Sequence, residues 1–334
     1  MKRRNVFDLR SLILGITFGW MLTACNDNDI KDPIIDEPAD QVAYIAFNES
    51  IDDTWVAKYS AAGVETALSD GKKDAHVTSL ILSGSDVFAS GSVLNSKNQS
   101  YALYWKNGVA VLLTDSTSNQ YALAQDIAVS DGNVYVAGYM FNGNHAIAMY
   151  WKNGVAVELS DGKTPSYARS IFVVGNDVYV AGNVMNKPWG GTSEARYWKN
   201  GEEIKLKGSY ASSIFVVGST VYVAGSFGTT PSYFKNGVAV LLNEAGNIGT
   251  SDIFADGENV YVASPGMYWK NDTKVNLSGA AVSSLFVLDK DVYIGGFSYN
   301  GNKYVAQFWK NGEVTDLTDG TNNAQVSSIF VAAQ

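Results

Sequence analysis

The chain has 334 residues, a single cysteine and a formal net charge of −9. This acidic balance excludes the basic surface that nucleic-acid-binding proteins need, and one cysteine excludes a disulfide within the chain. The length is sufficient for one large all-β domain behind a short leader.

The N-terminus has the pattern of a secretory signal. Basic residues from Lys2 to Arg10 precede an apolar run, 12–22, which is shorter than the roughly 20 residues of a membrane span. We therefore expect residues 1–24 to be a signal peptide. Leu22-Thr23-Ala24-Cys25 resembles the lipobox of bacterial lipoproteins, which implies that Cys25 is lipidated and becomes the first mature residue. The alternative is a plain secreted protein with a chance cysteine.

Residues 25–41 are expected to form a tether. The segment after Cys25 is acidic, contains Pro33 and Pro38 and has little apolar character, which is typical of a flexible, solvated chain. An acidic stretch behind the lipidated cysteine resembles the export signal of Bacteroidota surface lipoproteins. That resemblance implies an outer-membrane location, held by the lipid anchor alone, on the cell surface rather than in the periplasm.

From residue 42 to residue 334 the chain repeats itself. The phrase Tyr-Trp-Lys-Asn-Gly at 104–108 returns, with small changes, at 150–154, 197–201, 233–237, 268–272 and 308–312, after a worn copy at 59–63. Successive copies end at 63, 108, 154, 201, 237, 272 and 312, so the steps run from 35 to 47 residues. Self-similarity of this period predicts a repeat architecture.

Each repeat reads as four short strands. The first resembles Ser-Ile-Phe-Val (170–173), the second is Val-Tyr-Val-Ala-Gly (178–182), the third ends in the Tyr-Trp-Lys phrase, and the fourth resembles Val-Ala-Val-x-Leu (155–159). Asn-Gly between the third and fourth strands is a strong signal of a two-residue hairpin. Antiparallel four-stranded units with no expected helix are the blades of a β-propeller.

The two ends of the repeat region predict how the ring closes. Val42–Phe47 matches a second strand with no first strand before it, and Ser327–Gln334 matches a first strand with nothing after it. Pairing them removes an exposed sheet edge. We therefore predict an all-β, seven-bladed β-propeller closed by pairing of the C-terminal strand with the N-terminal blade. An open solenoid, the alternative, would leave both ends unpaired.

The repeat resembles the Trp-x-x-Gly repeats of HAF-type extracellular proteins and, more loosely, kelch-like propellers. The resemblance covers residues 42–334 and implies the same architecture, but propellers host unrelated functions.

The two faces of such a propeller should differ. With the first strand innermost, the links from strand one to two and from three to four lie on one face, where they are short and uniform; we call it the quiet face. The links from strand two to three and between blades lie on the other, the variable face, and differ in length. Loops on a rigid scaffold carry function, so the binding surface is expected on the variable face.

Comparison among the copies separates scaffold from candidate site. The repeated Trp105, Trp151, Trp198, Trp269 and Trp309, with Phe234, are expected to pack between blades. The candidate ligand-binding residues are aromatic or basic, are not repeated and fall on the variable face: Trp55, Tyr121, Phe141, His145, Tyr167, Arg169, Trp189, Arg196, Tyr210, Phe227 and Tyr299.

Tyr and Trp among Asn, Ser and Gly suit a neutral sugar or another ring-bearing ligand. The alternative is that these side chains only pack their own loops. Arg169 could grip a carboxylate or phosphate, but pairing with Asp126 or Asp252 is the favoured interpretation.

Other chemistry has little support. The two histidines lack a metal-ligand spacing, and no nucleophile stands beside a base, so no metal, cofactor or catalytic residue is predicted. A glycosidase needs two carboxylates, but Asp126 and Asp252 replace serine at one repeat position, which indicates a hydrogen bond to backbone.

We expect a monomeric, lipid-anchored binding protein for a small molecule or glycan. Resemblance to Bacteroidota propeller lipoproteins implies a possible TonB-dependent transporter as partner. A glycoside hydrolase or lyase using channel-mouth carboxylates, and a protein-interaction scaffold in an envelope complex, are the alternatives.

Overall fold

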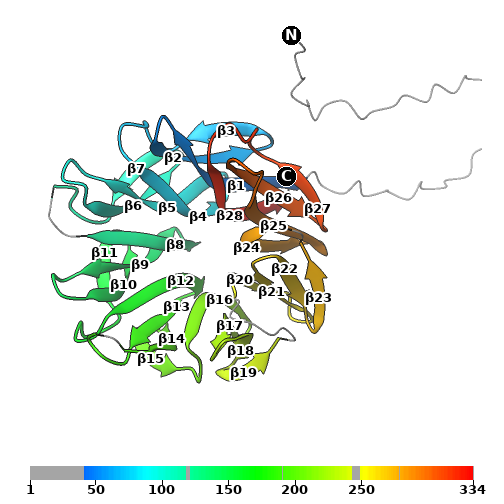
Figure 1. The fold of residues 1–334 in the computed structure, drawn as a ribbon. Coiled ribbons are helices and arrows are strands. Elements are labelled where there is room, and N and C mark those ends of the chain that lie inside the picture. The colour runs from blue at the N-terminus through cyan, green and yellow to red at the C-terminus, as the bar shows by residue number, and fades with distance from the viewer. Residues whose placement is uncertain (1–40, 118–120, 190, 243–248, 278, 334) are drawn as a thin grey trace, which may run out of the picture.

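The computed structural model describes residues 41–333 except 118–120, 190, 243–248 and 278. The described residues form seven four-stranded antiparallel sheets around a central axis (Figure 1). The predicted all-β, seven-bladed propeller is therefore confirmed. No helix long and apolar enough to cross a membrane occurs in the described part of the chain. The leader and tether, with Cys25, lie outside the described residues.

Every blade has the same strand order from the axis outward. Blade 1 is β28 with β1–β3, and blades 2 to 7 are β4–β7, β8–β11, β12–β15, β16–β19, β20–β23 and β24–β27. The innermost strands are β4 (Ala75–Ser83), β8 (Ala122–Ser130), β12 (Ser166–Val174), β16 (Tyr210–Val217), β20 (Asp252–Ala255), β24 (Ala281–Leu288) and β28 (Ala324–Ala333).

The second strands are β1 (Gln41–Ile51), β5 (Asp86–Leu94), β9 (Asn133–Phe141), β13 (Asp177–Met185), β17 (Thr220–Phe227), β21 (Val260–Ser264) and β25 (Asp291–Tyr299). The third strands are β2 (Thr54–Ala61), β6 (Ser100–Lys106), β10 (Ala146–Lys152), β14 (Ser193–Lys199), β18 (Thr230–Lys235), β22 (Met267–Lys270) and β26 (Tyr304–Lys310). The outer strands are β3 (Val64–Ala67), β7 (Val109–Leu112), β11 (Val155–Glu158), β15 (Glu202–Lys205), β19 (Val238–Leu241), β23 (Thr273–Asn276) and β27 (Glu313–Asp316).

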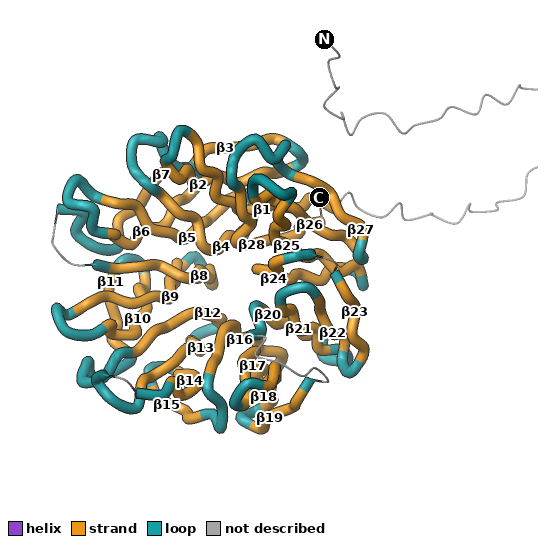
Figure 2. The backbone as a smooth tube through the Cα atoms, in the orientation of Figure 1, coloured by secondary structure: helices purple, strands orange, loops and turns teal. Residues whose placement is uncertain are grey.

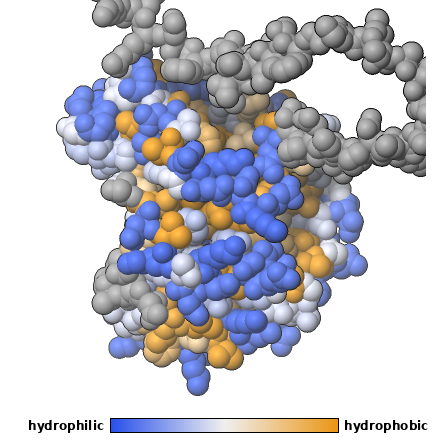
Figure 3. All heavy atoms as spheres, turned by 90° about the vertical axis from the view of Figure 1, so that its right-hand side faces the viewer, coloured by the Kyte–Doolittle hydropathy of each residue, from blue (hydrophilic) through white to orange (hydrophobic). Residues whose placement is uncertain are grey.

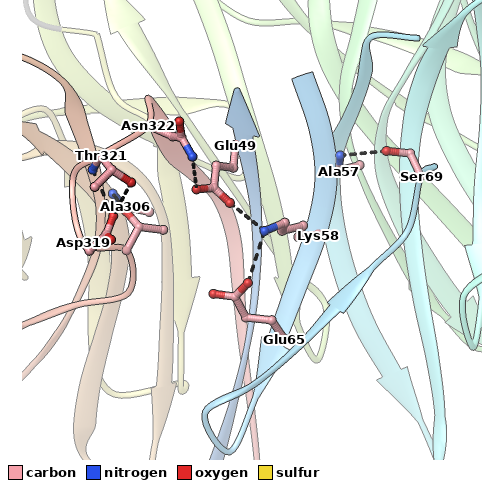
Figure 4. A network of polar contacts seen from close by, with 10 residues as sticks. Glu49, Ala57, Lys58, Glu65, Ser69, Ala306, Asp319, Thr321 and Asn322 are labelled. Carbon is pink, nitrogen blue, oxygen red and sulfur yellow. Dashed lines mark hydrogen bonds and ion pairs between the residues drawn. The ribbon is translucent and has the colours of Figure 1, made fainter. Parts of the chain in front are cut away.

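Ring closure follows the prediction. β28 pairs antiparallel with β1, with Tyr44 opposite Phe330, so the last strand completes the first blade. An ion-pair network joins the same blade across its width (Figure 4): Lys58 Nζ lies 2.6 Å from Glu49 and 3.2 Å from Glu65. Asn322, in the link before β28, donates to Glu49 at 3.2 Å. Burial lowers the pKa of Lys58, but the bonds to the two glutamates outweigh it and leave the pKa raised.

The recurring phrase is scaffold. Its tryptophans are buried between blades: Trp105, Trp151, Trp198, Trp269 and Trp309, as is Phe234. Its lysine lies over the aromatic ring of the neighbouring second strand, as Lys152 does over Tyr135 at 5.2 Å. Its asparagine takes a positive φ (50° at Asn107) and its side-chain oxygen accepts a hydrogen bond from the second strand of the same blade, at 2.8 Å from Val87 N. Each residue of the phrase thus has a packing or turn role, as expected.

The link lengths divide the faces as predicted. On the quiet face every link between third and outer strands spans two residues, such as 107–108 and 153–154. On the variable face the links range from 52–53 in blade 1 to 186–192 in blade 4 and 242–251 between blades 5 and 6. Figure 2 shows these loops around the strand core.

The outer wall is mixed in character. Figure 3, which views the right-hand side of Figure 1, shows hydrophilic residues with scattered hydrophobic ones. Single valines on the outer strands are exposed, for example Val314 and Val109. Isolated exposed apolar residues are normal on a soluble surface and do not form a site.

Candidate functional site

Three cavities open between neighbouring blades on the variable face. The cavity between blades 2 and 3 has a volume of about 330 Å³ and includes His76 and Tyr121. The cavity between blades 3 and 4 measures about 240 Å³ and includes Tyr167 and Trp189. The third, between blades 5 and 6, measures about 470 Å³ and includes Tyr210. All three are walled by variable-face links and strand ends, where the sequence predicts binding.

An aromatic arc connects the first two cavities. The ring centroids of Tyr121 and Phe141 lie 5.5 Å apart, those of Phe141 and Tyr139 6.3 Å apart, and those of Tyr139 and Tyr167 5.0 Å apart. At one end Trp55 lies 5.6 Å from the His76 ring, which borders the cavity between blades 2 and 3. We define the aromatic arc as Trp55, His76, Tyr121, Tyr139, Phe141 and Tyr167.

Two members of the arc, Tyr139 and His76, were missed by sequence analysis. Tyr139 follows Gly138 in β9, at a place that reads as part of the repeated second strand. Blade 7 also has an aromatic residue at this position, Phe297, so comparison among the copies did not single out Tyr139. Burial raises the pKa of Tyr139 to about 12, so its phenol stays protonated and able to donate. Burial lowers the pKa of His76 despite the nearby Asp74 carboxylate, which favours a neutral ring.

Trp189 and His145 form the outer wall of the cavity between blades 3 and 4. Their rings lie 5.5 Å apart, and Trp189 is 79% exposed. The Nδ1 atom of His145 is buried but has no hydrogen-bond partner among the described residues. An exposed indole beside an unpartnered ring nitrogen offers a stacking surface and a polar contact within one cavity.

Arg169 lies between two aromatic residues that line different cavities, Tyr167 and Tyr210. Its guanidinium carbon lies 4.8 Å from the centroid of Tyr210 and 5.8 Å from that of Tyr167. Its Nε donates to Asn183 Oδ1 at 3.1 Å, and Asn183 in turn donates to Ser193 Oγ at 3.0 Å. The position was expected just before the innermost strand, but it lies inside β12, at a β-bulge between Ala168 and Ser170. A bulge re-aims a side chain, here toward the neighbouring blade.

The favoured pairing of Arg169 with Asp126 or Asp252 is wrong. No ion pair joins Arg169 to a carboxylate within the described ranges. Both aspartates are occupied by the backbone: Asp126 accepts from Ile127 N at 2.9 Å and from Ile171 N at 2.8 Å. Asp252 accepts from Ile253 N and Leu285 N, both at 2.8 Å.

The expected backbone role of this position is confirmed and extends from blade to blade. Serines at the same place do the same: Ser170 accepts from Ile214 N at 3.2 Å, and Ser328 accepts from Leu80 N at 3.1 Å. Each residue of this polar belt, defined by Asp126, Asp252 and the matching serines, ties its blade to the next one. Burial raises the pKa of both aspartates, although bonds from backbone and serine donors oppose the shift.

A phenylalanine collar lies on the quiet-face side of the polar belt. Ring centroids of neighbouring blades are 4.6 to 5.7 Å apart along Phe172, Phe215, Phe254, Phe286 and Phe330. The repeated Phe of the Ser-Ile-Phe-Val pattern could have indicated this collar, but in the sequence it looks like an ordinary core residue. Apolar rings on one side of the belt restrict polar recognition to the variable-face half of the innermost strands.

Three predicted site residues lie apart from the arc. Arg196 is in β14, not in a link, with a side chain only 4% exposed that bonds to Glu194 and Glu203. Phe227 is exposed at the end of β17, and Tyr299, 61% exposed, packs on Tyr304 in blade 7. The other eight, Trp55, Tyr121, Phe141, His145, Tyr167, Arg169, Trp189 and Tyr210, are brought together across blades 1 to 5.

No three His, Cys, Asp or Glu side chains within the described ranges are grouped so that they could hold a metal ion.

Comparisons with known proteins concern the fold alone. No protein-family model matches the chain, and no curated protein sequence matches it. A puromycin-hydrolysing peptidase from Mycobacterium tuberculosis is similar in structure, with a TM-score of 0.50 and 9% identity over 72% of this chain. This chain spans 46% of the peptidase, about half its length.

Two structures from Bacteroides show weaker similarity. A putative 6-phosphogluconolactonase from Bacteroides fragilis has a TM-score of 0.47 and 14% identity, covering 90% of this chain and 100% of its own. The extracellular domain of a putative one-component system from B. thetaiotaomicron has a TM-score of 0.46 and 9% identity, covering 74% of this chain and 33% of its own. At these identities the similarity carries no function.

Proposed function

We propose that this protein is a lipid-anchored, cell-surface binding protein that captures a glycan or another ring-bearing small molecule on the variable face of the propeller. The observation that carries the proposal is the aromatic arc, flanked by cavities between blades 2 and 3 and between blades 3 and 4. Ligand sites commonly combine aromatic walls with a few placed polar groups. Lipid attachment at Cys25, outer-membrane location and delivery to a TonB-dependent transporter are parts of the proposal that come from the sequence.

The polar belt makes a glycosidase less suitable as the function. Both channel-mouth carboxylates accept backbone N–H groups, so neither is free to act on a sugar in this arrangement. A scaffold in an envelope complex needs a protein partner rather than a small ligand, which the binding experiment distinguishes.

The proposal predicts that Trp189→Ala weakens ligand binding. An aromatic contact contributes about 1 kcal/mol beyond its buried area, so a loss of roughly five- to tenfold in affinity is expected. The purified full-length protein is screened against a library of glycans and small ring-bearing ligands, and hits are titrated calorimetrically.

Tyr299→Ala is the matched control, because it removes an exposed aromatic ring from the same face in blade 7 but lines none of the three cavities, whereas Trp189 lines one of them. Its affinity should equal that of the wild type. Product formation from a library member, or a co-purifying protein with no ligand binding at all, contradicts the proposal.

A further inference from the structure

Arg169 is a half-buried cation that pairs with no carboxylate among the described residues. We infer that the ligand carries a carboxylate, and that Arg169 binds it at the centre of the variable face. This inference rests on the proposed function and specifies the ligand as an acidic sugar.

The orientation of the guanidinium leaves a defined set of donors. Nε donates to Asn183, and the guanidinium carbon lies 4.8 Å from the centroid of the Tyr210 ring and 5.8 Å from that of the Tyr167 ring. The terminal nitrogens Nη1 and Nη2 donate to no described residue. Two parallel N–H donors at the end of a fixed guanidinium match the two oxygens of one carboxylate.

Asn183 holds the Arg169 guanidinium in this orientation. Its amide donates to Ser193 Oγ at 3.0 Å and to the Ser209 carbonyl at 3.3 Å, while its oxygen accepts from Arg169. Asn183 is almost fully buried, so the guanidinium is fixed before ligand arrives. A pre-organised donor loses less entropy on binding than a flexible surface side chain.

The surroundings of Arg169 favour one charge and several hydroxyl groups. The residues at the matching position of the other innermost strands are uncharged: Thr78, Gln125, Ser212, Ser251, Ser283 and Ser327. A single cation matches the single charge of a carboxylate, whereas a phosphate dianion would keep uncompensated charge.

The neighbouring cavity supplies hydroxyl partners. Tyr210 borders the cavity of about 470 Å³ together with Ser209, Thr250 and Ser251. Hydroxyl side chains donate and accept hydrogen bonds, as sugar hydroxyls do, and the Tyr210 ring offers a face for the sugar C–H groups. An arginine fork beside a tyrosine and several hydroxyls therefore fits a uronic-acid type of sugar.

The test compares uronic-acid trisaccharides with the same trisaccharides after reduction of their carboxylates to hydroxymethyl groups. Calorimetric titration of the purified full-length protein should show the acidic forms binding roughly 10- to 100-fold more tightly, the range for a hydrogen-bonded charge. Arg169→Gln should remove this preference, and added salt should weaken binding of the acidic form only.

Lys303→Gln is the matched control. Lys303 lies in the link before β26 on the same face and carries the same charge, but it is outside the arc and the cavities. This variant should keep the preference for the carboxylate. Thermal melting of Arg169→Gln within a few degrees of the wild type shows that any loss of affinity is not unfolding.

The other outcomes separate this inference from the proposed function. If acidic and reduced forms bind equally, or if Arg169→Gln retains the preference, the carboxylate inference is overturned while capture on the variable face stands. The same holds if only neutral glycans bind and Trp189→Ala weakens them. If no saccharide or other small molecule binds, both ideas fail.

Discussion

Asp252 occupies a position where serines of other blades accept a hydrogen bond from the backbone of the next blade. Its carboxylate accepts from Ile253 N and Leu285 N and receives Ser213 Oγ at 2.6 Å. With serine at 252, Leu285 N could donate to the serine hydroxyl, just as Ile214 N donates to Ser170 Oγ. The Ser213 hydroxyl, which now donates to Asp252, could then accept from Ile253 N. No backbone donor of the belt would then lose its partner, while a buried charge would be removed.

We therefore predict that the free energy of unfolding of Asp252→Ser exceeds that of the wild type increasingly as pH rises. Burial raises the pKa of Asp252 in the folded protein, so the carboxyl stabilises the fold only when protonated. Wild-type stability is therefore lost as pH rises from the unfolded pKa, about 3.9, through the raised folded pKa. Chemical unfolding at several pH values should show the two proteins diverging above about pH 4.

Asp86→Ser is the control with the opposite sign. Hydrogen bonds from Lys106 and Asn107 lower the pKa of Asp86, so its contribution is present at neutral pH and lost in acid. This variant should be closest to the wild type at low pH. A wild-type advantage over Asp252→Ser that grows with pH would show that the belt needs the charge.

At the scale of the element, the bulge of the innermost strand explains a glycine of the repeat. The bulge places the backbone carbonyl of Tyr167 against the second strand. A Cβ at Gly182 would lie only 1.9 Å from that carbonyl oxygen. Blade 6 supports this explanation, because β20 begins beyond the bulge position and Ser264 occupies the place of the glycine. The glycine is required by close approach rather than by a positive φ.

Gly182→Ala is therefore expected to lower the unfolding free energy by about 1–3 kcal/mol, the usual cost of overpacking. Denaturant unfolding measures the change. Gly249→Ala is the control, because a Cβ there meets nothing within 4 Å, and it should change stability by less than about 0.5 kcal/mol. Equal effects of the two substitutions would contradict the steric explanation.

Blade 1 replaces the same glycine in another way. Phe47 stands where five other blades have glycine, and Ser60 stands where those blades have tryptophan or, in blade 5, Phe234. Phe47 is fully buried and packs with Ala306 of blade 7, as Trp105 packs with Ala57 of blade 1. A ring on the second strand thus takes the space of the ring missing from the third strand.

Much of the fold could be predicted because the repeated copies within the chain can be compared with one another. Recurrence of the Asn-Gly turn and of Trp105 and its equivalents indicated the blades, and the unpaired end strands indicated closure. The bulges were not predicted, although each one shifts the alternation of buried residues, as between Ala168 and Ile171 in β12. Arg196 was predicted to lie in the link between the second and third strands of blade 4. It lies in β14 instead, because both strands are longer than expected and the link between them is shorter.

The candidate site was harder to predict than the fold. Sequence comparison indicates which residues are not repeated, but not which of them meet across blades. Tyr139 and Tyr167 lie in neighbouring blades, so their contact depends on the relative placement of two sheets. The backbone bond of Asp126 was predicted from the repeat, but the contacts of Arg169 with Asn183 and with Tyr210 of the next blade were not.

At the scale of the whole molecule, membrane attachment is predicted to depend on Cys25. Cys25→Ser should move the protein from the membrane fraction to the soluble fraction, because one cysteine carries the proposed anchor. Protease treatment of intact cells should release a folded fragment beginning near residue 41, detected by mass spectrometry. Full protection of the wild-type protein on intact cells would place it on the inner side of the outer membrane.

The closing pair of strands also determines the face of the propeller from which the tether starts. Gln41 pairs with Ala333 at the edge where the other blades have their quiet-face hairpins, so the segment from Cys25 joins the propeller on that face. A leash of 15 residues reaches at most about 50–54 Å when extended. If Cys25 carries the lipid, as proposed, the leash joins the face opposite to the one that bears Arg169 and Trp189. If the protein delivers ligand to a transporter in the same bilayer, as proposed, the propeller would have to turn on its leash, and leash length as well as affinity would then govern transfer.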